Sequence, residues 1–172
     1  ISARYGSSRY KGKPLVKILG KEMVIRVADI CNKIKNVKVF VATDSKKIAN
    51  VVKKYGYKYI FTSSSCLTGT DRVAEASKKI RSKIYINVQG DEPTINPKDI
   101  KKVIETKKKF PNHVVCGYDK VHDFENPSNI NLPKVVVNSK GELIYISRSL
   151  VPGKKKISQK IQYHKQVCIY AF

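Results

Sequence analysis

The stretch from residue 4 to residue 14, RYGSSRYKGKP, carries the residue types best suited to chemistry in this chain. It holds two arginines, two lysines, two glycines and two serines, and it contains no acid. Glycine lets a backbone approach a ligand closely, and fixed cations and hydroxyls around such a backbone suit a polyphosphate. The spacing matches neither the G-x-x-x-x-G-K-[ST] loop nor the G-x-G-x-x-G turn, which argues against both of those nucleotide-binding classes. An exposed basic loop in a basic protein is the alternative that this stretch leaves open.

A second polar segment, residues 89–93 (QGDEP), follows an apolar run and carries two adjacent carboxylates. Mg²⁺ prefers one or two carboxylates together with phosphate oxygens and water, so Asp91 is predicted to be a metal ligand. If the backbone stays extended, Glu92 points to the other side, and we expect only one metal ligand here. A turn that leads into a helix is the alternative, since Asp, Glu and Pro all suit turns.

A third polar cluster, residues 68–72 (TGTDR), precedes a helical pattern that extends to about residue 80. Thr70 or Asp71 is predicted to cap this helix, because short polar side chains accept hydrogen bonds from the first helical N–H groups. Arg72 is then expected to reach toward a nucleotide. A capping motif with no further function is the alternative.

These segments need a scaffold, and the hydrophobic pattern predicts alternating strands and helices. Strands are expected at residues 37–42, 57–62 and 83–88. Helices are expected at residues 23–35, from a cap at Ser45 through Lys54, at about 70–80, and from Pro97 to about Lys109. This alternation predicts a mostly parallel sheet with helices on both faces, a Rossmann-like three-layer α/β/α fold. Ligands of such sheets bind outside the carboxyl ends of the strands, where the basic loop, Thr43-Asp44 and residues 89–93 all fall.

After residue 112 the pattern changes to β segments. They are expected at residues 114–121, 134–138, 142–147 and 165–172, with a tight turn at residues 139–141. The 172 residues suit one domain. A phosphate loop of an α/β protein should follow a buried strand, yet it lies almost at Ile1, and the last expected strand reaches Phe172. We therefore expect the domain to be incomplete, with sequence missing at both ends.

The net charge of +22 raises nucleic-acid binding as an alternative function. Of the 35 cations, however, 29 are lysines and only six are arginines, whereas nucleic-acid readers rely on arginine and on stacking aromatics. We interpret most of the charge as solvated surface and expect no nucleic-acid partner. No segment approaches the roughly 18 consecutive apolar residues of a membrane span, so no membrane partner is expected either.

The four cysteines are widely spaced and form no C-x-x-C pair, which argues against a zinc site and a disulfide framework. The reducing cytoplasm is the expected compartment. Those in apolar surroundings are expected to be small buried hydrophobes: Cys31, Cys116 and Cys168. The histidines have no metal-like spacing and are expected to be ordinary surface residues: His113, His122 and His164.

Five segments, in this order, resemble the 3-deoxy-manno-octulosonate (Kdo) cytidylyltransferases, also called CMP-Kdo synthetases: ARYGSSRYKGKPL, VFVATD, TGTDRVAEA, INVQGDEP and KQVCIYAF. These enzymes belong to the wider sugar nucleotidyltransferase family, which includes the CMP-sialic acid synthetases. The first segment marks the wider family, and TGTDR with QGDEP points to the Kdo branch. The resemblance extends from Ala3 to Phe172 and implies a fold of the nucleotide-diphospho-sugar transferase type.

The resemblance implies a magnesium-dependent reaction in which CTP and Kdo give CMP-Kdo and pyrophosphate for lipopolysaccharide biosynthesis. The implied catalytic residues are Arg9, Lys13 and Asp91, with Asp91 as the metal ligand. The implied nucleotide-binding residues are Arg4, Ser7, Ser8, Lys13 and Arg72. The implied sugar-binding residues are Gln89, Arg148, Gln166 and Tyr170. The resemblance also implies a homodimer, with residues 127–160 as the dimerisation or sugar-side segment.

The chain departs from the family pattern at three points. Ser2 stands where the family's I-P-A-R-Y segment has proline, and Gln166 stands where a histidine is common. The G-x-D-[ST]-P segment that carries the family's second metal-binding aspartate is absent from this sequence. Gln166 leaves open the same chemistry on another acid sugar, such as sialic acid or 8-amino Kdo.

Overall fold

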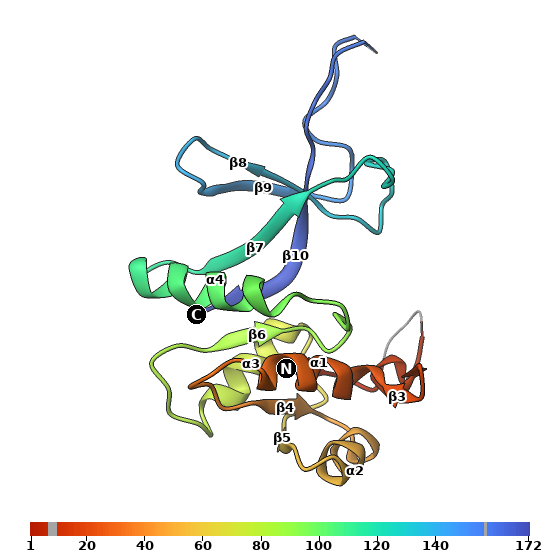
Figure 1. Cartoon of the computed structure of the whole chain (residues 1–172), viewed down its shortest axis with the longest axis vertical. Helices are drawn as coiled ribbons and strands as arrows, with labels where there is room; N and C mark the ends of the chain where they lie inside the picture. The colour runs from red at the N-terminus through yellow and green to blue at the C-terminus, as the bar shows by residue number, and fades with distance from the viewer. Residues whose placement is uncertain (7–9, 157) are drawn as a thin grey trace. The chain divides into compact units, whose positions relative to one another are not determined.

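The computed structural model describes residues 1–6, 10–156 and 158–172, and the chain forms two compact units (Figure 1). The first unit comprises Ile1–Val115 together with Cys168–Phe172, and the second comprises Cys116–Val167. In sequence, the second unit is therefore an insertion into the first.

The first unit is built on a mostly parallel sheet, which confirms the predicted fold class. Its strands are β1 (Ser2–Ala3), β4 (Phe40–Thr43), β5 (Lys58–Phe61), β6 (Ile86–Val88) and the end of β10 (His164–Ala171). Strand β4 pairs in parallel with β1 and with β5. On the other side of β1, Ser2 forms a parallel bridge with Gln89, the residue that follows β6. The end of β10 pairs antiparallel with β6.

This strand order places a topological switch point between β1 and β6. From β1 the chain moves through β4 to β5 on one side, and it then returns to place β6 on the other side of β1. The connections that follow β1 and β6 leave in opposite directions, and ligands of α/β sheets bind at this kind of position. The residues after Ala3 and after Val88 are therefore brought to one place.

The described part of this unit contains four α-helices: α1 (Met23–Asn32), α2 (Lys46–Lys54), α3 (Gly69–Ser77) and α4 (Pro97–Lys109). Helix α2 contacts β4 and β5, whereas α3 contacts β1, β4 and β6. In Figure 1, α2 lies at the β5 end of this unit and α4 lies at the opposite end. The buried core joins β1 and β4 to α1 and α2 through Ala3, Val24, Ile25, Val41, Ile48 and Val52. Burial of these apolar side chains fixes the strand end from which the basic loop starts.

The observed boundaries of α4 and α1 agree to different degrees with those predicted from the sequence. Helix α4 spans the predicted residues, and the Asn96 side chain accepts a hydrogen bond from Lys98 N at its start. Helix α1 ends at Asn32, before the predicted residue 35, because Lys33 N turns back to Ile30 O. A short helical turn, η1 (Lys13–Leu15), and a hairpin of β2 (Lys17–Ile18) and β3 (Lys21–Glu22) were not predicted.

Helix α3 begins earlier than the sequence suggested. Its N-cap is Thr68, whose hydroxyl accepts from Asp71 N, and the Asp71 carboxylate accepts from Thr68 N in return. These hydrogen bonds from Thr68 hold the pKa of the Asp71 carboxyl below its usual value. The prediction that Thr70 or Asp71 is the cap was therefore wrong, because Asp71 occupies the third helical position of a capping box.

The second unit contains the β-rich segment. Its strands are β7 (Val115–Lys120), β8 (Lys134–Val137), β9 (Leu143–Ser147) and the first part of β10. Strand β8 pairs antiparallel with β9 and with β10, and β7 pairs with β10. The predicted turn is present between β8 and β9, where Gly141 adopts a φ of +79° that favours glycine. The single domain and the dimerisation role of residues 127–160 stay predictions.

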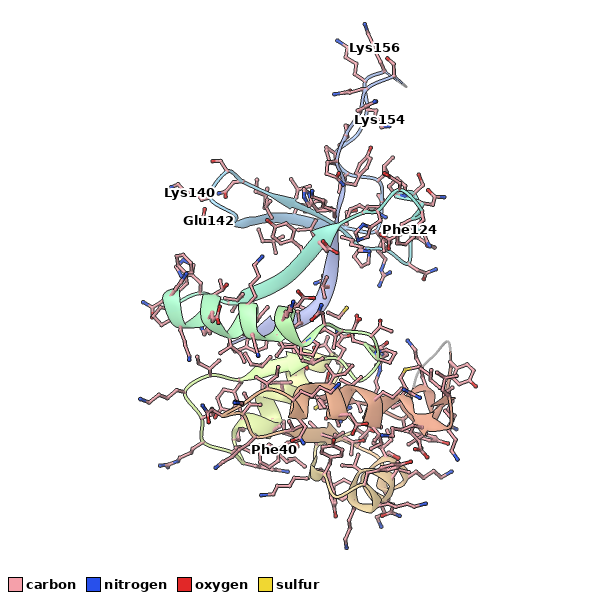
Figure 2. The ribbon with its side chains drawn as sticks, viewed as in Figure 1. Phe40, Phe124, Lys140, Glu142, Lys154 and Lys156 are labelled. Atoms are coloured by element: carbon pink, nitrogen blue, oxygen red, sulfur yellow. The ribbon has the colours of Figure 1, made fainter. Side chains whose placement is uncertain are left out.

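The surface of the second unit displays many of its charges. Lys140 and Glu142 lie at the β8–β9 turn, and Lys154 and Lys156 project from the loop that follows β9 (Figure 2). All four of these side chains are exposed. None of the helices in the described ranges combines the length and apolar character needed to cross a membrane.

All four cysteines are free thiols. Cys31 is buried in α1, as predicted. Cys116 and Cys168 are only partly buried, so the prediction of buried hydrophobes was wrong for these two. The reason for Cys168 is its place on β10, whose first five residues are all only partly covered.

Candidate functional site

The basic loop is closed at the base by glycine. Gly12 N donates to Tyr5 O at 2.8 Å, and Gly12 has a φ of +76°. A Cβ at this position would lie 3.2 Å from the Tyr5 ring, so a larger residue would be both strained and crowded. The closed loop delivers Lys13 at the start of η1, where Pro14 fixes the next turn. The predicted loop residues Ser7, Ser8 and Arg9 lie outside the described residues.

The segment after β6 lies directly against β1. Gly90 N donates to Ser2 O at 3.0 Å, and a Cβ on Gly90 would lie only 3.0 Å from that same carbonyl oxygen. Because no larger side chain fits there without a shift, Gly90 allows the next residue, Asp91, to sit beside the basic loop. Lys13 Nζ contacts Asp91 Oδ2 at 2.7 Å, across 78 positions of sequence. Two residues that the sequence analysis predicted separately are thus ion-paired.

The two adjacent carboxylates have different surroundings. Asp91 is partly exposed, with 38% of its side-chain surface accessible. Burial raises the pKa of the Glu92 carboxyl, and the charge of Asp91 adds to this rise, while hydrogen bonds from Cys168 oppose it. In the described ranges, no three acidic, histidine or cysteine side chains gather into a cage for a metal ion. Asp91 alone fits an ion that takes its other ligands from phosphate and water, as Mg²⁺ does.

A cavity of about 470 Å³ opens between the ends of β1, β4 and β5. Its lining residues are Arg4, Tyr5, Gly6, Asp44, Ser45, Lys46, Ser64, Cys66 and Arg72. Arg4 Nη1 donates to Leu67 O at 3.5 Å, in the loop that precedes α3. Arg4 and Arg72, both predicted to bind nucleotide, are therefore brought to one cavity. A volume of this size matches that of small-molecule sites.

Arg72 is held by the protein rather than presented freely to the cavity. Its side chain is 2% exposed, and its Nη2 donates to Asp44 Oδ2 at 3.0 Å. Its Nη1 donates to Thr62 Oγ1 and to Ser63 O. Arg72 therefore joins the carboxyl ends of β4 and β5, and it contributes to the cavity mainly as a fixed wall.

Asp44 lines the cavity, and its position at a strand end was predicted although no role was assigned to it. While one of its oxygens accepts from Arg72, the other accepts from Tyr5 N at 3.2 Å. Asp44 thus ties the basic loop to the end of β4, which a carboxylate can do because it has two acceptor oxygens. The signal was the Thr43-Asp44 pair at a strand end, although its partner in α3 could not be known from the sequence.

Two predicted sugar-binding residues lie on neighbouring strands of the first unit. Tyr170 on β10 is opposite Asn87 on β6, and Gln89 follows two positions later. Since side chains two positions apart share a face of a strand, Gln89 and Tyr170 belong to the same face of the sheet. The structure therefore places these two residues, both partly buried, on one face of the sheet.

The other two predicted sugar-binding residues lie in the second unit. Lys134 is in register with Ser147 on β9 and with Lys165 on β10. Arg148 and Gln166 are the next residues along those strands, so they flank the start of β8 from its two sides. Gln166 N donates to Pro133 O at 2.9 Å, and Gln166 Nε2 contacts Cys116 Sγ at 3.8 Å.

A parallel sheet with a basic loop and a carboxylate at its switch point is the arrangement of a nucleotide-binding α/β protein. The cytidylyltransferase family model matches residues 1–172. The 3-deoxy-manno-octulosonate cytidylyltransferase of Escherichia coli is 38% identical, over all of this chain and 70% of its own length. The corresponding protein of Chlorobium phaeobacteroides is 35% identical, over all of this chain and 71% of its own.

A solved structure agrees with these relatives. It is a CMP:2-keto-3-deoxy-manno-octonic acid synthetase in complex with CTP, 37% identical to this chain, with a TM-score of 0.89. The match covers 99% of this chain and 71% of that one. The chain belongs to the cytidylyltransferase family, in its 3-deoxy-manno-octulosonate branch.

Proposed function

We propose that the chain transfers CMP from CTP to the anomeric hydroxyl of Kdo, giving CMP-Kdo and pyrophosphate for lipopolysaccharide biosynthesis. The observation that carries this proposal is the contact of Lys13 with Asp91 at the switch point, in a chain of this family. At this position Lys13 provides a positive charge for a bound triphosphate, and Asp91 provides a carboxylate for its metal ion. Nucleotidyl transfer needs this combination more than it needs covalent chemistry.

The reaction is a displacement at the α-phosphorus. The sugar hydroxyl attacks this phosphorus, and pyrophosphate leaves in line with the attack. Lys13, with Arg9 from the same loop, neutralises the charge that develops on pyrophosphate. Arg4 and the serines of the loop hold the nucleotide, and the Arg72–Asp44 pair keeps the cavity wall in place.

We propose Mg²⁺ as the cofactor, held by Asp91. When bound, Mg²⁺ polarises the α-phosphate and lowers the pKa of the attacking hydroxyl. Lys13 contacts the same carboxylate, so the two cations compete for Asp91. Triphosphate draws Lys13 toward its own oxygens and thereby leaves Asp91 to the metal.

From the resemblance to the family, we assign the acid sugar to Gln89, Tyr170, Arg148 and Gln166. Gln89 and Tyr170 share a sheet face, and Arg148 supplies a cation suited to the sugar carboxylate. Gln166 stands where a histidine is common in the family, so the preferred acid sugar could differ from Kdo. Sialic acid and 8-amino Kdo are the two alternatives.

We also propose that the protein acts as a homodimer in the cytoplasm. Strand β9 is at an edge of its sheet and exposes three apolar side chains, Leu143, Ile144 and Tyr145, by 50%, 63% and 57%. An exposed apolar edge strand is a typical pairing surface. Sedimentation velocity tests this proposal, and a monomer at all concentrations overturns it. The four free thiols are consistent with a reducing compartment.

The test of the reaction is pyrophosphate release from CTP and Mg²⁺, with Kdo, sialic acid and 8-amino Kdo as separate acceptors. We expect release with Kdo and little with the other two. Release with a different acid sugar would change the assigned acceptor but keep cytidylyl transfer as the reaction. No release with any acceptor, together with no calorimetric binding of CTP, would overturn the function.

A further inference from the structure

Lys134 is a buried cation that the reaction does not use. Its side chain is 0% exposed at the start of β8. Its ammonium donates to Asn129 O at 2.9 Å and to Arg148 O at 2.7 Å. Within the described residues it forms no ion pair with an acid. Two carbonyl groups therefore replace the counter-ion that a buried charge normally needs.

Arg148 completes the arrangement in the opposite direction. Its Nη1 donates to Ile130 O at 2.8 Å, in the loop whose Asn129 carbonyl binds Lys134. The loop at 129–130 and residue 148 are thus joined twice, once by each side chain. We call these three hydrogen bonds the 129–148 clasp.

We propose that Lys134 is a positioning residue that fixes Arg148 for the carboxylate of the acid sugar. This inference rests on the proposed function, which assigns Arg148 to the sugar. The physical reason is that Lys134 holds Arg148 through its backbone carbonyl and not through its guanidinium. An aspartate at position 134 could not donate to either carbonyl, and its negative charge would neutralise Arg148. Lysine bonded to carbonyls holds the backbone of Arg148 and leaves the guanidinium charge uncompensated for an anion.

Lys107 provides the matched comparison. It is also buried, at 7% exposure, and its ammonium also donates to two carbonyls, Pro111 O and His113 O, each at 2.8 Å. Those carbonyls lie just beyond the end of α4, where a lysine stabilises the last turn. Lys107 therefore shares the burial and the bonding of Lys134, but it is linked to no predicted site residue.

The first experiment compares Lys134→Met with Lys107→Met without using activity. An arginine-specific protease cleaves after Arg148, and the reference is its cleavage after the exposed Arg81. Loss of the hydrogen bond to Arg148 O should raise cleavage of the Arg148–Ser149 bond about tenfold in Lys134→Met. The ratio of cleavage after Arg148 to cleavage after Arg81 should stay unchanged in Lys107→Met. An unchanged ratio in Lys134→Met would overturn the clasp, even if the protein has no activity on Kdo.

The second experiment separates positioning from general stability. In Lys134→Met the KM for Kdo should rise about tenfold while the KM for CTP stays within about twofold, and Lys107→Met should change neither. The double variant Lys134→Met/Arg148→Ala should be no worse than Arg148→Ala alone. Additive effects, or equal changes in both KM values, would overturn the role in positioning.

Two further variants keep the test decisive. Lys134→Arg retains a charged donor and should recover most of the low KM for Kdo. If Lys134→Met does not fold, Lys134→Gln takes its place with the same expected direction. Failure of wild-type protein to use any acid sugar would overturn the proposed function, while the protease ratio still decides the clasp.

Discussion

Lys13 in the first unit and Lys134 in the second are held in opposite ways. In the first unit, Lys13 is 43% exposed and is paired with the carboxylate of Asp91. In the second unit, Lys134 is 0% exposed and is paired with two backbone carbonyls. An exposed ion pair contributes little to stability, about 1 kcal/mol at most, so it can be exchanged for a ligand. A buried ammonium held by the backbone cannot be exchanged, and it serves to fix its neighbours.

The first unit also contains its own fixed cation. Arg72 is buried to the same degree as Lys134, but its partner is a carboxylate, Asp44. Together they join the residues that follow β1, β4 and β5. The comparison teaches that burial separates the cations that build the site from those that meet the substrate.

The largest expected effect comes from the carboxylate of the exchangeable pair. Asp91→Asn should reduce pyrophosphate release by about 10³-fold, because the neutral amide binds Mg²⁺ poorly and loses charge at the reacting phosphate. Its free energy of unfolding should change by less than about 1 kcal/mol, since the pair is exposed. Asp123→Asn, at an exposed loop position, is the control. Substantial turnover in Asp91→Asn would remove the metal assignment.

Substitution in the buried Arg72–Asp44 pair should mainly reduce the stability of the protein. Arg72→Met leaves the Asp44 carboxylate buried without its partner, and the free energy of unfolding should fall by about 3 kcal/mol in urea. Adding Asp44→Asn should restore part of this loss, because the two sites are coupled. Exposed Arg81→Met is the control. A loss below about 1 kcal/mol would mean that Arg72 does not build the site.

Lys13→Met tests the exchangeable cation itself. Its kcat should fall by about 10²-fold, because the departing pyrophosphate loses one stabilising charge. Its free energy of unfolding should change by less than about 1 kcal/mol. Lys11→Met removes an equal charge from the same loop and should have a much smaller effect on kcat. Equal losses in the two variants would show that only the total charge of the loop matters.

The smallest expected effect is the contribution of Lys134 to the pH dependence of the free energy of unfolding. Burial lowers the pKa of its ammonium, and the charge of Arg148 lowers it further. Between that lowered pKa and the ordinary value of about 10.4, the unfolded chain binds more protons than the folded one, so stability rises with pH. Relative to Lys134→Met, the wild type should therefore gain stability as the pH rises across this alkaline window. Urea unfolding at a series of pH values measures the difference, and a constant difference would contradict the buried charge.

The sequence predicted those parts of the fold that depend on local pattern. Helix α4 was predicted from Pro97 to about Lys109, and it spans Pro97–Lys109, because proline at the first helical position marks the start. Asp91 and the basic loop could both be assigned to strand ends, and their meeting followed from the rule for parallel sheets. The two-residue strands β2 and β3 were missed because they are too short to show alternation.

The remaining features depend on contacts that no local pattern records. Arg72 and Lys134 belong to residue types that are usually exposed, and only their distant partners make burial possible. Asp44 lies 28 positions from Arg72, and Arg148 lies 14 positions from Lys134. The sequence showed these residues at strand and helix ends, but it could not show which of them would be enclosed.

Calorimetric titration of Mn²⁺ into the protein, with and without CTP, tests whether Lys13 and a metal ion exchange at Asp91. We expect weak Mn²⁺ binding to the protein alone, because Lys13 occupies Asp91, and clearly tighter binding once CTP is present. Comparison with a CTP-only titration removes the contribution of the nucleotide itself. In Asp91→Asn the gain from CTP should be lost. Mn²⁺ binding that ignores CTP, or that survives unchanged in Asp91→Asn, would contradict the account.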